Sequence, residues 1–126
     1  SLIEAAQRGK SLKNEPIYKD GFLKGLKAKE RAAEQGDDWA RFYLGSMNYN
    51  GDFLNQNYAQ TLRYYEPISQ TGKLPRTVLA LVNERLAQMY RDGKGTKANP
   101  SKADYYTRKA ADCGSLSAYK TIENVR

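Results

Sequence analysis

The sequence predicts an all-α protein, a short α-solenoid of stacked antiparallel helix pairs with about two to three repeats. One observation is a repeated segment, in which Leu44, Met47 and Gly51 recur 42 residues later as Leu86, Met89 and Gly93. Another is a pair of small or apolar residues that stands three and four positions before a glycine. It occurs three times, as Ala32-Ala33 with Gly36, Ile68-Ser69 with Gly72, and Ala110-Ala111 with Gly114. These glycines lie 36 and then 42 residues apart. Periods of roughly 20–50 residues are typical of stacked helical repeats.

The stretch from Leu86 to Gly114 shows one complete repeat unit. It predicts the end of one helix, a glycine-rich turn, and a second helix that Pro100 begins and Gly114 ends. Proline suits the first helical turn because its missing N–H would have no partner within the helix there. Glycine suits the residue after the last turn, where the backbone is often left-handed. The unit is therefore a pair of helices joined by a turn.

The residues of this last unit carry a resemblance to a known family. The pattern is Leu-x-x-Met-Tyr, Gly-x-Gly, Ala-x-x-Tyr and Ala-Ala-x-x-Gly with a later alanine, formed by Leu86, Met89, Tyr90, Gly93, Gly95, Ala103, Tyr106, Ala110, Ala111, Gly114 and Ala118. It resembles the Sel-one-like repeat (SLR) family, a relative of the tetratricopeptide repeat. The middle unit departs from the family at Thr61, where alanine is favoured, and at Pro67 inside its second helix. The resemblance covers most of residues 25–118 and implies stacked, tetratricopeptide-like helix pairs.

The N-terminal residues 1–20 match the family poorly and are expected to form a cap or a degenerate repeat. Residues 2–9 favour a short helix that Gly9 ends. Residues 11–16 favour a connector, because the residue before Pro16 is disfavoured in a helix. Such caps are expected at the ends of a helical stack, where the outer faces have no neighbour.

A helix is predicted from about Tyr18 to Gln35. Its inward positions are spaced by about one turn and are Phe22, Leu26, Lys29 and Ala33. Gly36 ends this helix, and Asp37 or Asp38 is expected to cap the next one. A capping aspartate accepts hydrogen bonds from the first backbone N–H groups and favours the positive helix end.

Two more helices are predicted in the middle of the chain, from Trp39 to Tyr49 and from about Tyr58 to Thr71. In the first of them, Trp39, Tyr43 and Met47 form one apolar line, and Ala40, Leu44 and Met47 form a neighbouring line. In the second, Pro67 removes a backbone hydrogen bond and clashes with the carbonyl of Arg63. We therefore expect a kink or an early end of this helix.

The C-terminal part predicts a helix from about Pro75 to Arg91, a helix from Ser101 to Cys113 and a closing helix that Ser115 caps. The first has the strongest apolar stripe in the chain, which comprises Val78, Leu81, Val82, Leu86 and Met89. The whole chain, residues 1–126, is predicted to be a single SLR-like domain. Its parts are the cap in 1–20, the first repeats in 21–72, the best-matching repeat in 73–114 and the closing helix in 115–126.

The composition excludes several kinds of site. The chain has one cysteine, Cys113, and no histidine, so we expect neither an internal disulfide nor a zinc site of the usual kind. Catalytic triads that depend on histidine are excluded for the same reason. The segment Gly93 to Thr96 lacks the first glycine and the preceding strand of a Walker-type phosphate loop. We therefore expect no enzyme, no catalytic residues, no cofactor and no metal, and Cys113 is expected to be a partly buried structural thiol.

The net charge of +7 is concentrated toward the C-terminus. Residues 73–126 hold eleven Lys and Arg against five Asp and Glu, whereas residues 37–72 hold two against four. A basic repeat would attract a partner with an acidic surface and speed its association. Nucleic acid is a weaker alternative, because cations interleave with Tyr105 and Tyr106 but no recognition motif accompanies them.

The ten tyrosines are the most unusual excess in the composition. A tyrosine ring is a large apolar body with a polar tip, which suits both a helical core and a binding surface. Those at repeat-matching positions are expected to pack inside, and they are Tyr43, Tyr64, Tyr65, Tyr90 and Tyr106. The surface candidates are Tyr49, Tyr58, Tyr105 and Phe53.

These features predict a non-catalytic protein–protein interaction module. The resemblance implies an adaptor or inhibitor, and small exported bacterial relatives resemble immunity proteins that neutralise a toxin delivered by a secretion system. The sharper hypothesis is therefore an immunity protein that binds a secreted toxin or effector. The alternatives are a general SLR scaffold or signalling adaptor and, in another class, a basic nucleic-acid-binding module. The predicted contact residues are exposed positions on first helices and loops, namely Arg41, Asn48, Tyr49, Phe53, Arg85, Arg91 and Lys94.

The sequence offers limited information on location. It begins with Ser1 and contains neither an apolar signal stretch nor an apolar run of about 18 residues that could span a membrane. We expect either a segment taken from a longer protein or a mature form whose leader peptide has been removed. The compartment is therefore not encoded in the sequence: a removed leader is compatible with the bacterial periplasm, and its absence with the cytoplasm.

Overall fold

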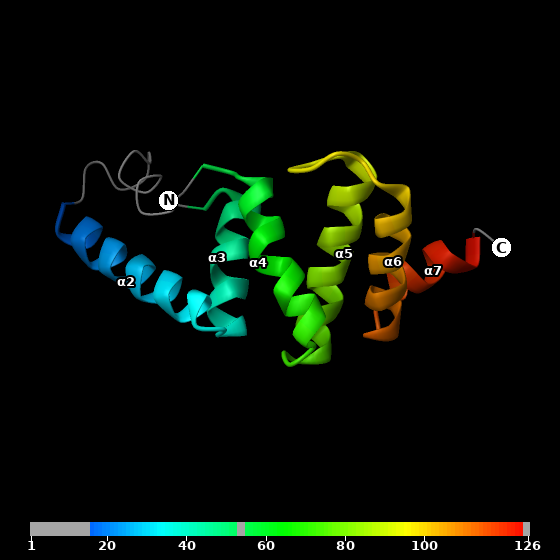
Figure 1. The fold of residues 1–126 in the computed structure, drawn as a ribbon, viewed down its shortest axis with the longest axis horizontal. Helices are drawn as coiled ribbons and strands as arrows, with labels where there is room; N and C mark the ends of the chain where they lie inside the picture. Colours follow the sequence, from blue (N-terminus) through cyan, green and yellow to red (C-terminus); the bar gives the residue numbers. More distant parts are fainter. Residues whose placement is uncertain (1–15, 53–54, 125–126) are drawn as a thin grey trace. The chain divides into compact units, whose positions relative to one another are not determined.

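The computed structural model describes residues 16–52 and 55–124, and every regular element among them is an α-helix, as predicted (Figure 1). The helices are α2 (Pro16–Glu34), α3 (Asp38–Asn50), α4 (Tyr58–Thr71), α5 (Arg76–Asp92), α6 (Pro100–Asp112) and α7 (Leu116–Asn124). The chain divides into two compact units, unit 1 with residues 1–64 and unit 2 with residues 65–126. The boundary lies inside α4, which therefore contributes to both units. The helix predicted over residues 2–9 lies outside the described residues, as does most of the connector after it.

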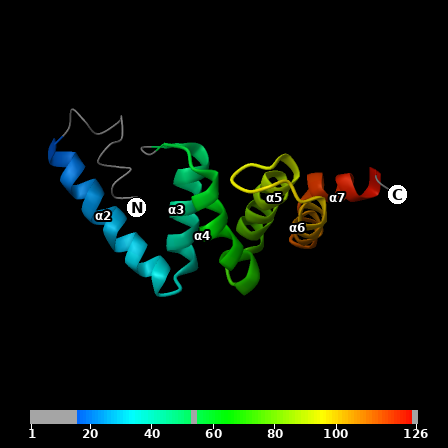
Figure 2. The same cartoon turned by 45° about the horizontal axis from the view of Figure 1, so that its top comes forward.

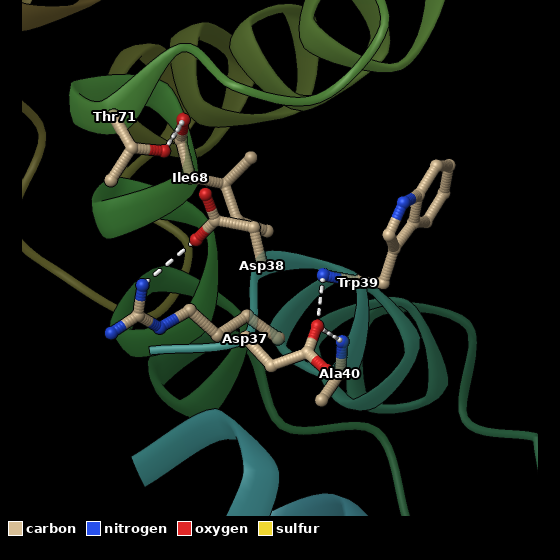
Figure 3. Close-up of polar contacts among 7 residues, drawn as sticks. Asp37, Asp38, Trp39, Ala40, Ile68 and Thr71 are labelled. Atoms are coloured by element: carbon tan, nitrogen blue, oxygen red, sulfur yellow. Dashed lines mark hydrogen bonds and ion pairs between the residues drawn. The ribbon is translucent and has the colours of Figure 1, made fainter. Parts of the chain in front are cut away.

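Unit 1 is built on the packing of α2 against α3. Its buried core consists of Leu26, Ala33, Ala40, Leu44 and Met47, with Phe22, Leu23, Ala32 and Tyr64 partly buried around it. Asp37 caps α3 as expected, because its Oδ1 accepts hydrogen bonds from the backbone N–H groups of Trp39 and Ala40, at 2.9 and 3.2 Å (Figure 3). Gly51 ends α3 in a left-handed conformation, with φ of 75°.

One side of α3 is oriented differently from the prediction. Tyr43 was expected to pack inside, but its side chain is 43% exposed, and Trp39, one turn earlier, is 54% exposed. The neighbouring line of Ala40 and Leu44 faces the core instead. The prediction for Tyr43 is therefore wrong, because a helix with two adjacent apolar lines can bury only the line that meets its neighbour.

Helix α4 has the predicted bounds, and Pro67 does not end it early, since the helix continues to Thr71. The hydroxyl of Thr71 donates to the carbonyl of Ile68 at 3.2 Å in this last turn (Figure 3). Within unit 1, Thr61 is fully buried, and its hydroxyl donates to the carbonyl of Gly45 in α3 at 2.9 Å. Threonine thus supplies a contact between α3 and α4 at a position where the SLR resemblance leads one to expect alanine.

Unit 2 is organised around α5, whose core side chains are Leu79, Val82, Leu86 and Met89. Helix α6 lies beside α5 in both views (Figures 1 and 2). It begins at Pro100 because Asn99 caps it, with the Asn99 side chain accepting a hydrogen bond from the N–H of Lys102 at 3.1 Å. These two helices have the predicted positions to within about one residue, as ends defined by local caps usually allow.

The predicted closing helix is confirmed as α7. The hydroxyl of Ser115 accepts a hydrogen bond from the N–H of Ala118 at 3.1 Å, which makes it the expected cap. Ala118 is buried against the rest of unit 2, whereas Leu116 and Tyr119 are 65% and 53% exposed. Cys113 is half-buried at the end of α6, as expected.

Candidate functional site

The first candidate site lies where α5 ends and α6 begins. Tyr90, in the last turn of α5, accepts a backbone hydrogen bond from the N–H of Asn99 at 2.7 Å, so the loop returns to the point where it started. Gly93 begins this loop with φ of +70°, and a Cβ there would lie 3.2 Å from the backbone nitrogen of Ala98. The left-handed backbone therefore favours glycine at this position, and any side chain would also make a tight contact with the backbone of Ala98.

This loop gathers exposed cations at one end of the helix pair. We define the basic surface as Arg91, Lys94, Lys97 and Lys102, all of which are exposed. The Arg91 guanidinium also donates to the hydroxyl of Thr107 at 3.2 Å, which fixes it against α6. Asp92 is an exposed acidic residue in the same segment. The surface keeps an excess of positive charge and suits an acidic partner.

Beneath the basic surface, Glu66 joins three elements of unit 2. Its Oε2 accepts hydrogen bonds from the hydroxyls of Tyr90 and Tyr106, at 2.9 and 2.8 Å. The two tyrosine rings are stacked with centroids 5.7 Å apart, and the ammonium of Lys102 lies 5.0 Å from the Tyr90 ring centroid. Burial, together with the hydrogen bond to Glu66 and its negative charge, raises the pKa of Tyr90 to about 12. The same causes, in the same order, raise the pKa of Tyr106.

The structure separates the predicted contact residues into different groups. In unit 2, Arg91 and Lys94 are exposed and belong to the basic surface. Arg85 is half-buried, and its guanidinium donates to the hydroxyl of Tyr65 at 2.8 Å, so it supports the packing of α4 and α5 within this unit. Arg85 therefore does not form part of the basic surface.

The predicted contact residues of unit 1 lie apart from that surface in the sequence. Arg41 is half-buried and pairs with Asp38 at 2.8 Å, and the ring of Tyr49 packs edge-to-face with Tyr58 at 5.6 Å between centroids. Asn48 is only 1% exposed, and its amide donates to the carbonyl of Leu44 at 2.9 Å. The expectation that Asn48 is exposed is therefore wrong, because its side chain is buried with its amide bonded to the backbone of its own helix, α3. Phe53 lies outside the described residues.

A second candidate site, which the sequence did not reveal, is a groove of about 750 Å³ between α2 and α3 in unit 1. We call it the α2–α3 groove. From α2 it is lined by Gly25, Ala28, Lys29 and Ala32, and from α3 and its ends by Asp37, Trp39, Ala40, Phe42, Tyr43, Ser46, Met47, Asn50 and Asp52. A signal for it was present in the small residues of α2, which leave the aromatic line of α3 uncovered.

The groups gathered at the two sites can contact a binding partner. Among the described residues, no group of three or more His, Cys, Asp or Glu side chains is placed to hold a metal ion. Within the same residues, no helix combines the length and the apolar character needed to cross a membrane. The two sites offer cations, aromatic rings and apolar side chains, and of these the aromatic rings and arginine are enriched at protein interfaces.

Comparison with known proteins supports the repeat pattern. The model of the Sel1 repeat family matches residues 40–69 and 82–115, and no curated protein matches the sequence significantly. A protective antigen of uropathogenic Escherichia coli strains that displays an SLR fold is 33% identical, with a TM-score of 0.60, and the match covers 71% of this chain and 18% of that one. A Sel1 repeat protein from Oxalobacter formigenes is 23% identical, with a TM-score of 0.65, and the match covers 78% of this chain and 27% of that one. The chain thus spans less than a third of either protein. The similarity of the two folds confirms the predicted all-α helical-repeat fold.

Proposed function

We propose, because the chain belongs to the Sel1 repeat family, that it is a binding module for an acidic surface of another protein. Sel1 repeat proteins generally serve as scaffolds for protein–protein interaction. The observation that carries the finer proposal is the basic surface at the α5–α6 loop, where four exposed cations lie within twelve residues of sequence. An acidic partner would be steered to it, and its docking would be strengthened at low salt.

The sharper form of the proposal is that the partner is a secreted toxin or effector, which the chain neutralises as an immunity protein. It is supported by the resemblance of small exported SLR proteins to such inhibitors and by the localised positive charge. A general scaffold or signalling adaptor is the alternative within the binding class. The two differ in stoichiometry, because an inhibitor forms one dedicated complex whereas an adaptor contacts several proteins.

The experiment is affinity capture from the source cell with the tagged chain as bait and mass spectrometry as the readout. Three baits are compared: the natural chain, R91E/K94E in the basic surface, and K73E/K120E, which reverses two exposed lysines outside that surface. We expect the natural chain and the control to retain one stoichiometric partner, and R91E/K94E to lose most of it. Equal capture by all three baits would contradict the role of the basic surface.

The immunity hypothesis is tested on the captured partner by expressing it with and without the chain. Growth arrest by the partner alone and its relief by the natural chain, but not by R91E/K94E, would support neutralisation. Recovery of nucleic acid without protein would instead favour the nucleic-acid-binding alternative. In that case the affinity for any oligonucleotide should fall steeply with salt, because counterions are released on binding.

A further inference from the structure

The α2–α3 groove leaves two large aromatic side chains of α3 exposed on one helix face. Trp39 and Tyr43 are one turn apart and remain 54% and 43% exposed, although both line the groove. About half of each side chain is therefore still in contact with water. Covering both rings would remove this apolar surface from water, which favours binding.

The opposite wall, on α2, is made of small residues. Gly25, Ala28 and Ala32 face the groove, and a Cβ placed on Gly25 would find no atom outside its own helix within 4 Å. Glycine inside a helix is less favourable than alanine, and no packing among the described residues requires it at this position. A wall of this kind allows the backbone of another helix to approach closely.

The charges around the groove favour a cationic occupant. Asp37 stands at the start of α3 and Asp52 just after its end, and the 13 residues of α3 correspond to about 20 Å. The carboxylate of Asp37 is already hydrogen-bonded by two backbone N–H groups. Asp52 instead adds its charge to the partly negative C-terminal end of α3. The cation that lines the groove, Lys29, has its ammonium 4.4 Å from the Tyr43 ring centroid.

We propose that the α2–α3 groove binds an amphipathic α-helix of a partner protein, about four turns long, with a lysine or arginine near Asp52. Its apolar face lies between the alanines of α2 and the rings of Trp39 and Tyr43. This inference goes beyond the proposed function, because it concerns unit 1 and selects positive charge, whereas the basic surface of unit 2 selects negative charge. The two sites can therefore fail or succeed independently.

The test uses fluorescence, because Trp39 is the single tryptophan of the chain. The probes are two synthetic helical peptides with the same Leu/Ala face, one with lysines and one with glutamates in its end turns. We expect the lysine peptide to shift the Trp39 emission to the blue and to bind at least about tenfold more tightly than the glutamate peptide. Equal binding of the two peptides, or an unchanged Trp39 emission with both, would overturn the inference.

Variants place the binding in the groove. A28F fills the groove from the α2 wall, and A59F makes the same change at an exposed position of α4 that does not line it. A28F should weaken the lysine peptide at least about tenfold and A59F should leave it unchanged, with circular dichroism confirming that both variants are folded. D52K should reverse the preference toward the glutamate peptide. Equal effects of A28F and A59F would overturn the inference.

Two other occupants are distinguished by the same signal. If the emission maximum of Trp39 in the free chain shifts to the blue as the protein concentration rises, a second copy of the chain fills the groove. If the emission maximum is already blue-shifted in the free chain and does not depend on concentration, another part of the same chain covers the groove. Either result would overturn the proposal of a partner helix, while capture through Arg91 and Lys94 would still test the proposed function separately.

Discussion

At the scale of single residues, the buried polar side chains define contacts that hydrophobic periodicity does not reveal. Asn83 in α5 is 1% exposed, donates to the carbonyl of Leu79 at 2.8 Å and accepts from the hydroxyl of Ser69 in α4 at 2.6 Å. Thr61 makes the corresponding contact between α4 and α3 in unit 1. Each polar group is satisfied inside the helix pair, so these residues fix how neighbouring helices sit against each other.

The Thr61 contact can be tested with a substitution that keeps the side-chain shape. T61V removes the hydroxyl that donates to the Gly45 carbonyl, and should lower the free energy of unfolding by about 1 kcal/mol. T121V is the matched control, because the Thr121 hydroxyl is exposed and donates to the carbonyl of Ser117 in its own helix. Urea denaturation of the two variants checks this, and an equal effect of both would show that the contact with Gly45 contributes nothing.

The hydrogen bonds of Tyr90 and Tyr106 to Glu66 predict that the protein loses stability at high pH. The pKa of Tyr90 rises from 10.0 in the unfolded chain to about 12 in the folded one, and that of Tyr106 also rises. Between these values the folded protein holds protons that the unfolded chain has released. The stabilisation is therefore complete below pH 10.0 and is lost as the pH rises toward about 12.

This pH dependence is measured by urea denaturation at pH values from about 9 to about 11. Y106F removes one of the two titrating hydroxyls and should make the decline shallower than in the natural chain. Y105F, which alters the exposed neighbouring ring, should retain the natural slope. An unchanged slope in Y106F would contradict the role of the Glu66 contact.

At the scale of helices, the residues that cap the helix ends allowed the bounds of the helices to be predicted from the sequence. Asp37, Asn99 and Ser115 each cap a helix through a hydrogen bond to a backbone N–H a few residues later, and such bonds depend only on nearby residues. The buried face of α3 could not be predicted in this way, because its two apolar lines are equivalent until α2 is placed beside one of them. The error at Tyr43 and the missed α2–α3 groove share this cause, whereas the burial of Asn48 is that of a polar side chain whose amide bonds to the carbonyl of Leu44.

Pro67 gives a prediction for α4, which continues through it to Thr71. Proline lacks the N–H that would bond to the carbonyl of Arg63, and inside a helix it costs up to about 3 kcal/mol. P67A should therefore raise the free energy of unfolding by about 1–3 kcal/mol. Q70A, at an exposed position one turn later, controls for the helix preference of alanine. If P67A is less stable than the natural chain, the packing of the half-buried proline ring outweighs the missing hydrogen bond.

At the scale of the whole molecule, charge is distributed unevenly along the chain. The segment 73–126 carries eleven basic and five acidic residues, whereas 37–72 carries two and four. The exposure of Arg91 and Lys94 was predicted from the sequence, because Arg91 lies in the last turn of α5 and Lys94 in the glycine-rich loop that follows it. The half-buried position of Arg85 was not, since it depends on the Tyr65 hydroxyl from the preceding helix. The sequence therefore predicts the exposure of the loop cations, whereas the environment of a cation inside a helix pair depends on its tertiary contacts.

The measurement that tests the central claim most directly is the association rate constant of the captured partner at a series of salt concentrations. The natural chain and K73E/K120E should associate fast at low salt and slow down as salt rises, because exposed charges are screened. R91E/K94E should associate about tenfold or more slowly at low salt and should lose most of the salt dependence. Identical association rates and salt dependences for R91E/K94E and K73E/K120E would contradict the claim that the basic surface recruits an acidic protein.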